Sequence, residues 1–336
     1  MTEHHRIRMF SQEIWAWYAR HKRTLPWRDM KLTNDTERAY RILISEVMLQ
    51  QTQVARVKIV FKNFLDRFPH ISDLAKASNK DVIMAWRGMG YNSRALRLRD
   101  AAHAIVTRSF VSRSSLEKPD NEQRATKIIF PMSMEELTSI PGIGPYTAAA
   151  IRNFAFNMPT PCIDTNIRRI LHRTFFGPEN ADGTWNKSDK ELLRVAEKVL
   201  STEDTANWHA ALMDFGSLVQ TKNNPKWDIC PLTARGIMKT TPLTFLRRGK
   251  ACLAPTTKKE PGRMVGQRYI PNRIFRGKIV EALRDADRAW TLEHIGKHIC
   301  IDWEARHRAW LRKLLAKLAV DQLVVWRKSG YVLSDM

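Results

Sequence analysis

The chain has 336 residues and a mass of 39.0 kDa, with 43% hydrophobic and 27% charged residues. This length fits two domains or one large one, and the composition, with no apolar run near the roughly 18 residues of a membrane span, excludes a largely disordered chain and an integral membrane protein. The 56 Lys and Arg against 34 Asp and Glu leave a net charge of +22. Such a charge attracts a polyanion, so nucleic acid is the first partner to consider.

The first residues and the cysteines indicate where the protein is located and whether it binds a metal. The first residues lack the apolar stretch of a secretory signal, so we expect a cytoplasmic protein, nucleoid-associated if prokaryotic, with no membrane partner. No C-x-x-C pair occurs among the four cysteines. Zinc and iron–sulfur sites are commonly built from such pairs, so we expect no metal site. The cysteines are Cys162, Cys230, Cys252 and Cys300.

Residues 1–236 are predicted to be mostly helical, because apolar residues recur at three- and four-residue spacing. Residues 237–272 are predicted to form a linker, since four prolines and three glycines interrupt them and eight Lys or Arg stand against one Glu. This linker is either a solvated tether or an extended basic strap along phosphates, and the two are compatible. The clearest helical stretches are residues 10–18, 39–65, 82–86, 95–106 and 192–200.

Residues 273–336 are predicted to form a winged-helix-like domain. Three amphipathic segments, at 276–284, 292–299 and 303–318, precede two short strands at 323–325 and 331–333. In such a domain the third helix enters a groove of DNA and the hairpin forms the wing. A helical cap that uses the same pattern for packing alone is the alternative. The residues that would face DNA are Arg306, Arg308, Arg312 and Lys313 on the helix and Arg327 and Lys328 on the wing.

The most informative stretch is residues 137–151, which contain the string P-G-x-G-x-x-T-A-x-x-I. A helix, a short turn and a second helix opening at Pro145 make a helix–hairpin–helix unit. Gly142 and Gly144 permit a positive φ and close approach of the backbone, and Pro145 suits a first helical turn whose free N–H groups point outward. Such a helix start binds phosphate, so Gly142, Gly144 and Thr147 are predicted to contact DNA.

Glu46 lies in a predicted helix with apolar residues at positions 42, 43 and 49, so its carboxyl faces the apolar side. Burial would raise the pKa of Glu46 toward neutrality and suit the side chain to hold and deliver a proton. The alternative is a glutamate at the edge of the core, paired with a nearby arginine.

Asp164 stands before another predicted helix, in the run I-D-T-N-I-R-R. Asp164, Thr165 and Asn166 are all good N-cap residues, so capping is the default interpretation of each. A carboxylate at a helix start is expected to stay ionised. Asp164 would then be the complement of a protonated Glu46, and carboxyl groups in divergent environments take the roles of acid and stabiliser.

Five motifs, in order, resemble those of a known family. They are L-P-W-R at 25–28, S-E-V-M-L-Q-Q-T-Q-V at 45–54, G-M-G-Y at 88–91, the hairpin string, and I-D-T-N-I-R-R at 163–169. Together they resemble the helix–hairpin–helix (HhH-GPD) DNA glycosylases over about residues 8–236, and the second motif resembles the MutY-type adenine glycosylases in particular. The resemblance implies an all-α, two-lobed helical body, followed here by the winged-helix-like module.

The resemblance also implies a role for each matching residue. Glu46 would protonate the flipped adenine, and Asp164 would stabilise the oxocarbenium-like sugar. Tyr146 and Asn166 would support Asp164. N-glycosidic cleavage needs a proton on a poor leaving base, negative charge beside the developing cation, and an unstacked base. The positions that wedge into the base stack are matched by Gln51 and Tyr91.

Tyr146 stands where lyase-competent relatives resembling endonuclease III have a lysine nucleophile, and no lysine lies between Pro141 and Arg169. A Schiff base therefore has no nucleophile here, and water should complete the reaction. We expect a monofunctional hydrolase that acts as a monomer on double-stranded DNA carrying a mismatch or an oxidised guanine.

The chain departs from the family pattern in three places. The family commonly holds a [4Fe–4S] cluster with four cysteines, but residues 220–231 keep only Cys230, so we expect no cluster and no other cofactor. Trp227 occupies one vacated position, where apolar packing would replace the metal. The end of the chain looks like a winged helix, whereas MutY proteins commonly end in a MutT-like domain. Asn92 replaces a second tyrosine expected after Tyr91, which would weaken stacking at the lesion.

Three functions remain open at this point. The leading hypothesis is a base excision repair enzyme that removes adenine opposite 8-oxoguanine or guanine. A rival removes thymine or uracil from mispairs with guanine, and a dispensable Glu46 would favour it because a pyrimidine has no N7 to protonate. A third is a catalytically silent DNA-binding protein. Two retained carboxylates, Glu46 and Asp164, argue against the third, because each would repel a polyanion.

Overall fold

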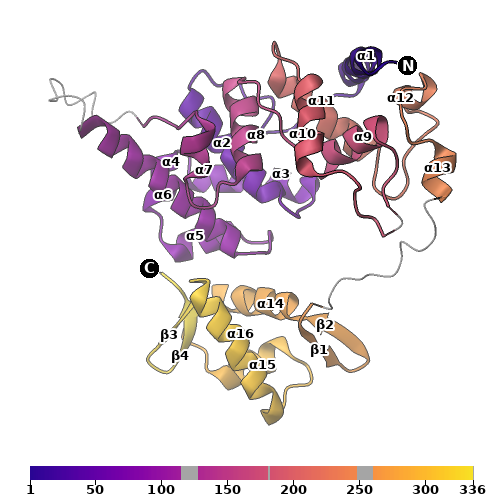
Figure 1. Ribbon diagram of the computed structural model, residues 1–336. Helices are drawn as coiled ribbons and strands as arrows, with labels where there is room; N and C mark the ends of the chain where they lie inside the picture. The colour runs from indigo at the N-terminus through magenta and orange to yellow at the C-terminus, as the bar shows by residue number, and fades with distance from the viewer. Residues whose placement is uncertain (115–127, 181, 248–259, 336) are drawn as a thin grey trace. The chain divides into compact units, whose positions relative to one another are not determined.

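The computed structural model describes residues 1–114, 128–180, 182–247 and 260–335 (Figure 1). By their internal contacts these residues divide into two compact units. Unit 1 comprises Met1–Ile42, Met132–Thr138 and Ile143–Thr256. Unit 2 comprises Leu43–Pro131, Ser139–Gly142 and Thr257–Met336. The described chain is mostly helical, which confirms the predicted fold class. The division of the sequence into residues 1–236, 237–272 and 273–336 stays a prediction.

Unit 1 is built around α11 (Thr205–Leu218), which packs against α1 (Glu3–His21), α8 (Pro145–Phe156) and α9 (Thr165–Phe175). Aromatic side chains fill this core, with Phe10, Trp208 and Phe215 almost completely buried. Burial of such large apolar surfaces is the main stabilising contribution to the unit. Its other helices are α7 (Met134–Thr138), α10 (Asp189–Lys198), α12 (Pro231–Ala234) and α13 (Pro242–Arg247).

A buried polar network also joins α8 to α11. The Nδ1 atom of His209 lies 2.9 Å from the carbonyl oxygen of Thr205, and its Nε2 atom lies 3.4 Å from Asn153 Nδ2. Asn153 in turn accepts hydrogen bonds from Thr160 N and Thr205 Oγ1. Burial lowers the pKa of His209 to about 4, so the imidazole is neutral at physiological pH.

The apolar pattern at residues 39–65 forms two helices, α2 (Asp35–Leu49) and α3 (Val54–Arg67), rather than one. The chain turns between them at Gln51, which has a left-handed φ of 56°. A contact with a residue far along the chain lies at this break. The guanidinium of Arg94, in a later helix, takes the carbonyl oxygens of Val47, Met48 and Gln50 and so satisfies the end of α2.

Unit 2 continues with α4 (Ile71–Lys76), α5 (Asn79–Ala85) and α6 (Ser93–Ser114), and α6 packs against both α4 and α5. Ser78 begins α5 as a side-chain cap, accepting from Asp81 N at 3.1 Å. Trp86 and Phe64 meet edge-to-face in this core with ring centroids 5.8 Å apart.

The C-terminal part of unit 2 contains three helices followed by an antiparallel hairpin, in the predicted order. Its apolar core takes in Phe275, Leu311 and Leu315 and continues to Ile83 on α5 and Leu96 on α6. That these helices and this hairpin contact DNA as a winged helix stays a prediction. The elements are α14 (Asn272–Arg284), α15 (Leu292–Ile299), a 3-10 turn (Ala305–His307), α16 (Arg308–Val320), β3 (Val324–Arg327) and β4 (Gly330–Leu333).

The predicted linker at residues 237–272 is in part structured. Besides α13, it contains an antiparallel hairpin, β1 (Gly262–Val265) and β2 (Arg268–Pro271). Val265 pairs with Arg268 across a two-residue turn in which Gly266 has a φ of +57°. The glycine that suggested a loose tether therefore supplies the turn of a hairpin. Residues 248–259 lie outside the described residues.

Within the part of the chain that the structure describes, no helix combines the length and apolarity needed to cross a membrane.

Candidate functional site

Asp164 is the N-cap of α9, as the sequence predicted. Its Oδ1 atom accepts from the backbone N–H of Ile167 at 2.6 Å, and its Oδ2 atom accepts from Asn166 Nδ2 at 2.9 Å. Burial nevertheless raises the pKa of Asp164, outweighing these hydrogen bonds and the nearby charge of Arg169. Desolvation is therefore the largest influence on this carboxyl, and that Asp164 stays ionised stays a prediction.

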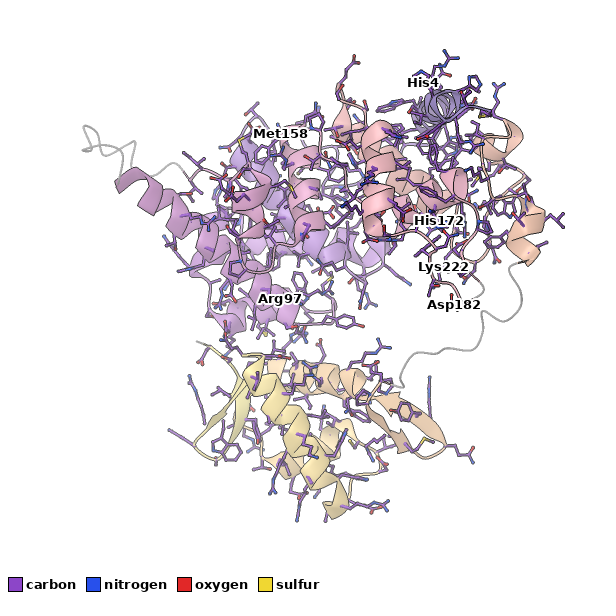
Figure 2. All side chains as sticks on the ribbon, viewed as in Figure 1. His4, Arg97, Met158, His172, Asp182 and Lys222 are labelled. Atoms are coloured by element: carbon purple, nitrogen blue, oxygen red, sulfur yellow. The ribbon has the colours of Figure 1, made fainter. Side chains whose placement is uncertain are left out.

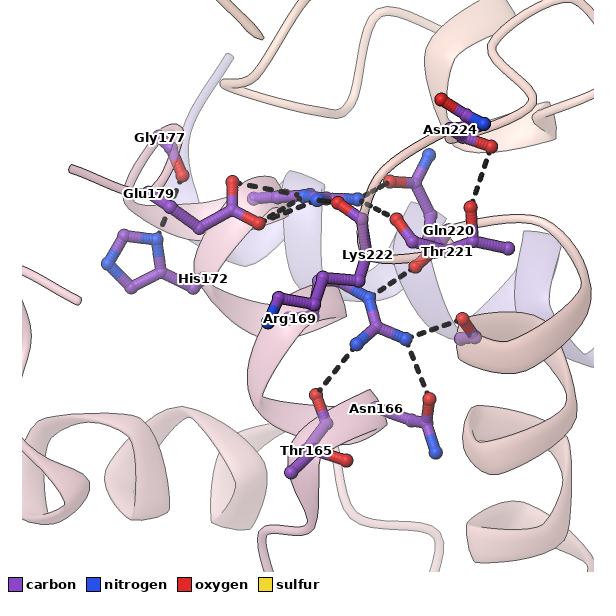
Figure 3. A network of polar contacts seen from close by, with 12 residues as sticks. Thr165, Asn166, Arg169, His172, Gly177, Glu179, Gln220, Thr221, Lys222 and Asn224 are labelled. Atoms are coloured by element: carbon purple, nitrogen blue, oxygen red, sulfur yellow. Dashed lines mark hydrogen bonds and ion pairs between the residues drawn. The ribbon is translucent and has the colours of Figure 1, made fainter. Parts of the chain in front are cut away.

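Arg169 holds Asn166 in the orientation that serves Asp164 (Figure 3). Its Nη2 atom donates to Asn166 Oδ1 at 2.6 Å and to the carbonyl oxygen of Gly216 at 2.7 Å, and its Nη1 atom donates to the carbonyl oxygen of Thr165 at 3.2 Å. Because the amide oxygen of Asn166 is taken by Arg169, its NH₂ group faces Asp164. Burial lowers the pKa of Arg169 to about 10, which leaves it charged at neutral pH.

Gly216 lets α11 approach the start of α9. A Cβ atom built at this glycine would lie 2.6 Å from Asn166 Cβ and 3.1 Å from Ile170 Cδ1. Real Cβ atoms essentially never lie 2.6 Å from another carbon, so a side chain at 216 would require Asn166 to shift. The glycine is therefore a structural requirement of the Asp164–Asn166 pair.

The segment that holds an iron–sulfur cluster in the resembling family does not fit one here. Cys230 is buried, and its Sγ atom lies 3.3 Å from Gln220 Nε2 and 3.8 Å from Met238 Sδ. A cluster of this kind needs four cysteine thiolates. Among the described residues, no three or more His, Cys, Asp or Glu side chains gather as a metal site would require.

A buried ion pair contacts the start of this segment. Arg173 Nη2 contacts Glu179 Oε1 at 2.6 Å, and Arg173 Nη1 donates to Gln220 Oε1 at 3.1 Å (Figure 3). The guanidinium also stacks on Phe245 and Trp227, at 4.8 and 6.0 Å from the ring centroids. Trp227 packs against Phe245, as predicted for this position. Its surroundings are not purely apolar, because the charged side chain of Arg173 lies against both rings.

In the helix–hairpin–helix motif at residues 137–151, one of the two glycines has the positive φ that the sequence predicts. Gly142 has a φ of +88°, and a Cβ there would contact Arg97, which is exposed on α6 (Figure 2). Gly144 is the N-cap of α8 with extended backbone, and Pro145 occupies the first turn. Gly144 therefore does not supply a positive φ. As an N-cap without a side chain, it leaves the first backbone N–H groups of α8 without a side-chain cap. The phosphate contact stays a prediction.

Tyr146 and Thr147 follow in the first turn of α8. Tyr146 is half-buried against the same apolar cluster as Ile163, the residue before Asp164. Thr147 is buried, so its side chain packs within unit 1 instead of facing solvent. A DNA contact through the Thr147 side chain has no support from this burial and stays a prediction.

Glu46 is buried on α2, with 7% of its surface exposed. The residues around it, from Ile42 to Met48, are all buried. The predicted burial of this carboxyl is confirmed, and its role as a proton donor stays a prediction.

Gln51 and Tyr91 lie in two loops of unit 2, and both are exposed with left-handed backbone. Asn92, in contrast, is buried and accepts from Arg284 Nη2 at 3.0 Å. Tyr91 Oη accepts from Arg273 Nη1 at 3.0 Å. The asparagine that replaces the expected second tyrosine thus anchors α14 to this loop.

The predicted DNA-facing residues of the C-terminal module are on its surface. Arg312 is exposed on α16, and Lys328 is exposed at the turn between β3 and β4 with a φ of 49°. Arg306 and Arg308 are exposed but pair with Glu304 and Glu293. Surface ion pairs of this kind are weak, and phosphates would compete with them.

The structure brings the predicted residues together in two groups. Asp164, Asn166 and Tyr146 lie in unit 1, whereas Glu46, Gln51 and Tyr91 lie in unit 2. There Arg94 binds the carbonyl oxygens of the residues directly before Gln51 and Tyr91. The sequence did not indicate Arg94, Arg169 or Gly216. Each arginine is one of many in a basic chain, and only the burial and the hydrogen bonds seen in the structure indicate their roles.

Residues 44–201 match the HhH-GPD superfamily of base excision DNA repair proteins.

Curated proteins named adenine DNA glycosylase are similar over most of the chain. The one from Mycolicibacterium smegmatis is 32% identical over 318 residues, which cover 95% of this chain and 93% of that protein. The one from Mycobacterium tuberculosis is 32% identical over 92% of this chain and 89% of its own length. The human one is 32% identical over 67% of this chain and 38% of its own length.

Solved structures share the fold. A thermostable thymine-DNA glycosylase aligns with a TM-score of 0.53 at 22% identity, over 70% of this chain and 95% of that one. A non-covalent endonuclease III–DNA complex aligns with a TM-score of 0.53 at 19% identity, over 71% of this chain and 96% of that one.

Proposed function

This chain belongs to the adenine DNA glycosylases of the HhH-GPD base excision DNA repair superfamily, and we propose that it hydrolyses the N-glycosidic bond of adenine mispaired with 8-oxoguanine or guanine. The observation that carries the proposal is Glu46, a carboxyl buried among apolar residues of α2. Adenine is a poor leaving base until it is protonated, and a sheltered carboxylic acid is the group suited to protonate it.

In this proposal Asp164 stabilises the sugar as positive charge develops on it. Asn166 orients the carboxylate, and Arg169 orients Asn166. Because these groups are already fixed by α9 and α11, little reorganisation is needed when the bond breaks. Tyr146 lines the same part of unit 1 and supports Asp164.

Water completes the reaction. Tyr146 stands where a lyase would carry its lysine, and the described residues of α8 include no lysine. The enzyme is therefore a monofunctional glycosylase that leaves an abasic site and an unbroken strand. It works without an iron–sulfur cluster, because Cys230 is the one cysteine of the 220–231 segment.

Double-stranded DNA is the partner. Gln51 and Tyr91 enter the base stack, the hairpin at Gly142 and Gly144 binds a phosphate, and Arg312 and Lys328 add contacts from the C-terminal module. We place the enzyme in the cytoplasm, at the nucleoid in a prokaryote, acting as a monomer.

Single-turnover excision tests the proposal. Duplexes carrying A opposite 8-oxoguanine, A opposite G, T opposite G and U opposite G are incubated with excess enzyme, with and without alkali. We expect release of adenine from the first two duplexes and strand breaks only after alkali. Release of thymine or uracil with adenine untouched would overturn the proposed substrate.

Glu46→Gln is the matching variant. It should abolish excision while leaving duplex affinity largely intact, because one acid is lost and little basic surface changes. Glu3→Gln is the control, since Glu3 is exposed on α1 and pairs with Lys198. An E46Q variant that still excises adenine at the wild-type rate would remove Glu46 from the chemistry.

A further inference from the structure

Two exposed side chains of unit 2 have a backbone conformation that disfavours them. Gln51 has a φ of 56° and Tyr91 a φ of 47°. Left-handed backbone is strained for residues other than glycine, and it persists only where the surroundings enforce it. The two residues lie in different loops, one after α2 and one before α6.

One guanidinium reaches both loops. Arg94 Nη1 donates to the carbonyl oxygen of Val47 at 3.0 Å and to that of Gln50. Arg94 Nη2 donates to Thr52 Oγ1 at 3.2 Å and to the carbonyl oxygens of Met89 and Gly90, each at 3.3 Å. The acceptors thus include the carbonyl oxygen directly before Gln51 and the one directly before Tyr91.

Each of these two carbonyl oxygens belongs to the peptide that leads into a left-handed residue. The peptide between residues 50 and 51 is planar, so a hydrogen bond to its carbonyl orients one of the two peptide planes that meet at the Cα atom of Gln51, and the same holds for residues 90 and 91. One planar group thus holds the peptide that enters each left-handed turn. Lysine, whose ammonium is a point donor, lacks this fork geometry.

The surroundings of Arg94 keep it in place. Only 4% of its surface is exposed, and its guanidinium lies 5.6 Å from the centroid of the Trp86 ring and 5.5 Å from that of Tyr91. Trp86 Nε1 donates to the same carbonyl oxygen of Gly90 at 3.1 Å, and Arg56 Nη1 donates to Gly88 at 3.0 Å. The loop before Tyr91 is thus held from two further sides.

We propose that Arg94 is a positioning residue that fixes Gln51 and Tyr91 relative to one another, so that both side chains enter the DNA duplex from rigid loops. The proposal rests on the proposed function, in which these two residues wedge into the base stack. Pre-organised loops pay less entropy on binding and open the duplex at one defined step. Arg94 acts through the two loops and touches neither the base nor the sugar.

Arg94→Lys and Arg94→Met test this, with Arg67→Met as the control that removes a charge from an exposed pair with Asp81. Three quantities are measured on the full chain. They are amide hydrogen exchange at residues 50–53 and 88–92, the fluorescence of 2-aminopurine placed beside the target adenine, and single-turnover excision. Arg94→Lys keeps the charge, so it reports on geometry even where Arg94→Met fails to fold.

In Arg94→Lys we expect faster exchange in both loops, a fluorescence rise on binding that is lost or much reduced, and excision slowed by about tenfold or more, as follows from losing hydrogen bonds to a charged donor. Affinity for matched duplex should stay within about threefold, because the charge remains. A merely structural role would instead lower affinity, flipping and thermal stability together.

Unchanged exchange in either loop would overturn the proposal, and so would excision at the wild-type rate with both loops loosened. Failure of the proposed function gives a different result. In that case the wild-type chain excises no base from any duplex, while the exchange measurement still decides whether Arg94 fixes the two loops.

Discussion

Replacing Asp164 by asparagine should separate the chemical role of this carboxyl from its structural one. The negative charge beside the sugar is lost, and removing one pre-organised electrostatic group of this kind costs on the order of 2–4 kcal/mol of transition-state stabilisation. At about 1.4 kcal/mol per factor of ten, excision of adenine should slow by roughly 30- to 1000-fold. Folding should be affected far less.

The small effect on stability follows from the contacts of Asp164. Asparagine is as good an N-cap as aspartate, so the hydrogen bond from Ile167 N is kept. The bond from Asn166 Nδ2 is lost, because two NH₂ groups then face each other, at a cost of about 1 kcal/mol. Against this, burial raises the pKa of Asp164, so its charged form destabilises the folded state. The two effects oppose each other, and the free energy of unfolding at pH 7 should change by about 1 kcal/mol or less.

The pH dependence gives the sign of the burial effect. A raised pKa means that the folded chain binds the proton of Asp164 more tightly than the unfolded chain does. The stability that this contributes is therefore present at low pH and lost as the pH rises through the raised pKa. Relative to wild type, Asp164→Asn should become more stable as the pH increases through this window. Excision by the wild type should fall as Asp164 is protonated below it.

The assay combines single-turnover excision with urea unfolding, each across a range of pH. Asp182→Asn is the matched control, since Asp182 is exposed and accepts from Thr184 N and Oγ1 (Figure 2). Excision by Asp164→Asn within twofold of wild type would remove Asp164 from the reaction. A loss of stability of several kcal/mol would show that the carboxylate is mainly a structural cap.

Two further variants test the surroundings of the site. Gly216→Ala should destabilise the fold by about 1–3 kcal/mol and slow excision, because the new methyl group overlaps Asn166, whereas Gly277→Ala, with nothing within 4 Å, should not. Unfolding and excision measurements that cannot tell G216A from G277A would refute this. His209→Gln should reduce acid sensitivity: burial lowers the pKa of His209 to about 4, so wild-type stability falls by about 3 kcal/mol as the pH drops from 6.5 to 4. Urea unfolding at pH 7 and pH 4.5 checks this, and equal losses in wild type and variant would contradict it.

The features that the sequence predicted correctly are local ones. The N-cap at Asp164, the proline opening α8 and the burial of Glu46 each depend on residues within one or two helical turns. The strands at the end of the chain also follow from a short alternating pattern. Periodicity and capping therefore located the elements that carry the predicted chemistry.

The features that the sequence missed depend on partners far away in the chain. The end of α2, at the break before α3, is bound by Arg94, more than forty residues later, and no pattern within residues 39–65 indicates it. The sequence alone indicates that Asn92 replaces a stacking tyrosine, and only the structure shows that Arg284 donates a hydrogen bond to it. The β1–β2 hairpin was hidden because glycine and proline indicate a loose chain and a tight turn equally well.

Buried arginines perform a similar task in both units. Arg169 orders Asn166 beside Asp164, and Arg94 orders the backbone before Gln51 and Tyr91. Burial lowers the pKa of each guanidinium to about 10, which is still well above 7, so both are charged at neutral pH. Removing such a group leaves several acceptors unsatisfied at once, which is more costly than losing any one hydrogen bond. Planar, multidentate cations thus join segments that are distant in sequence in both units.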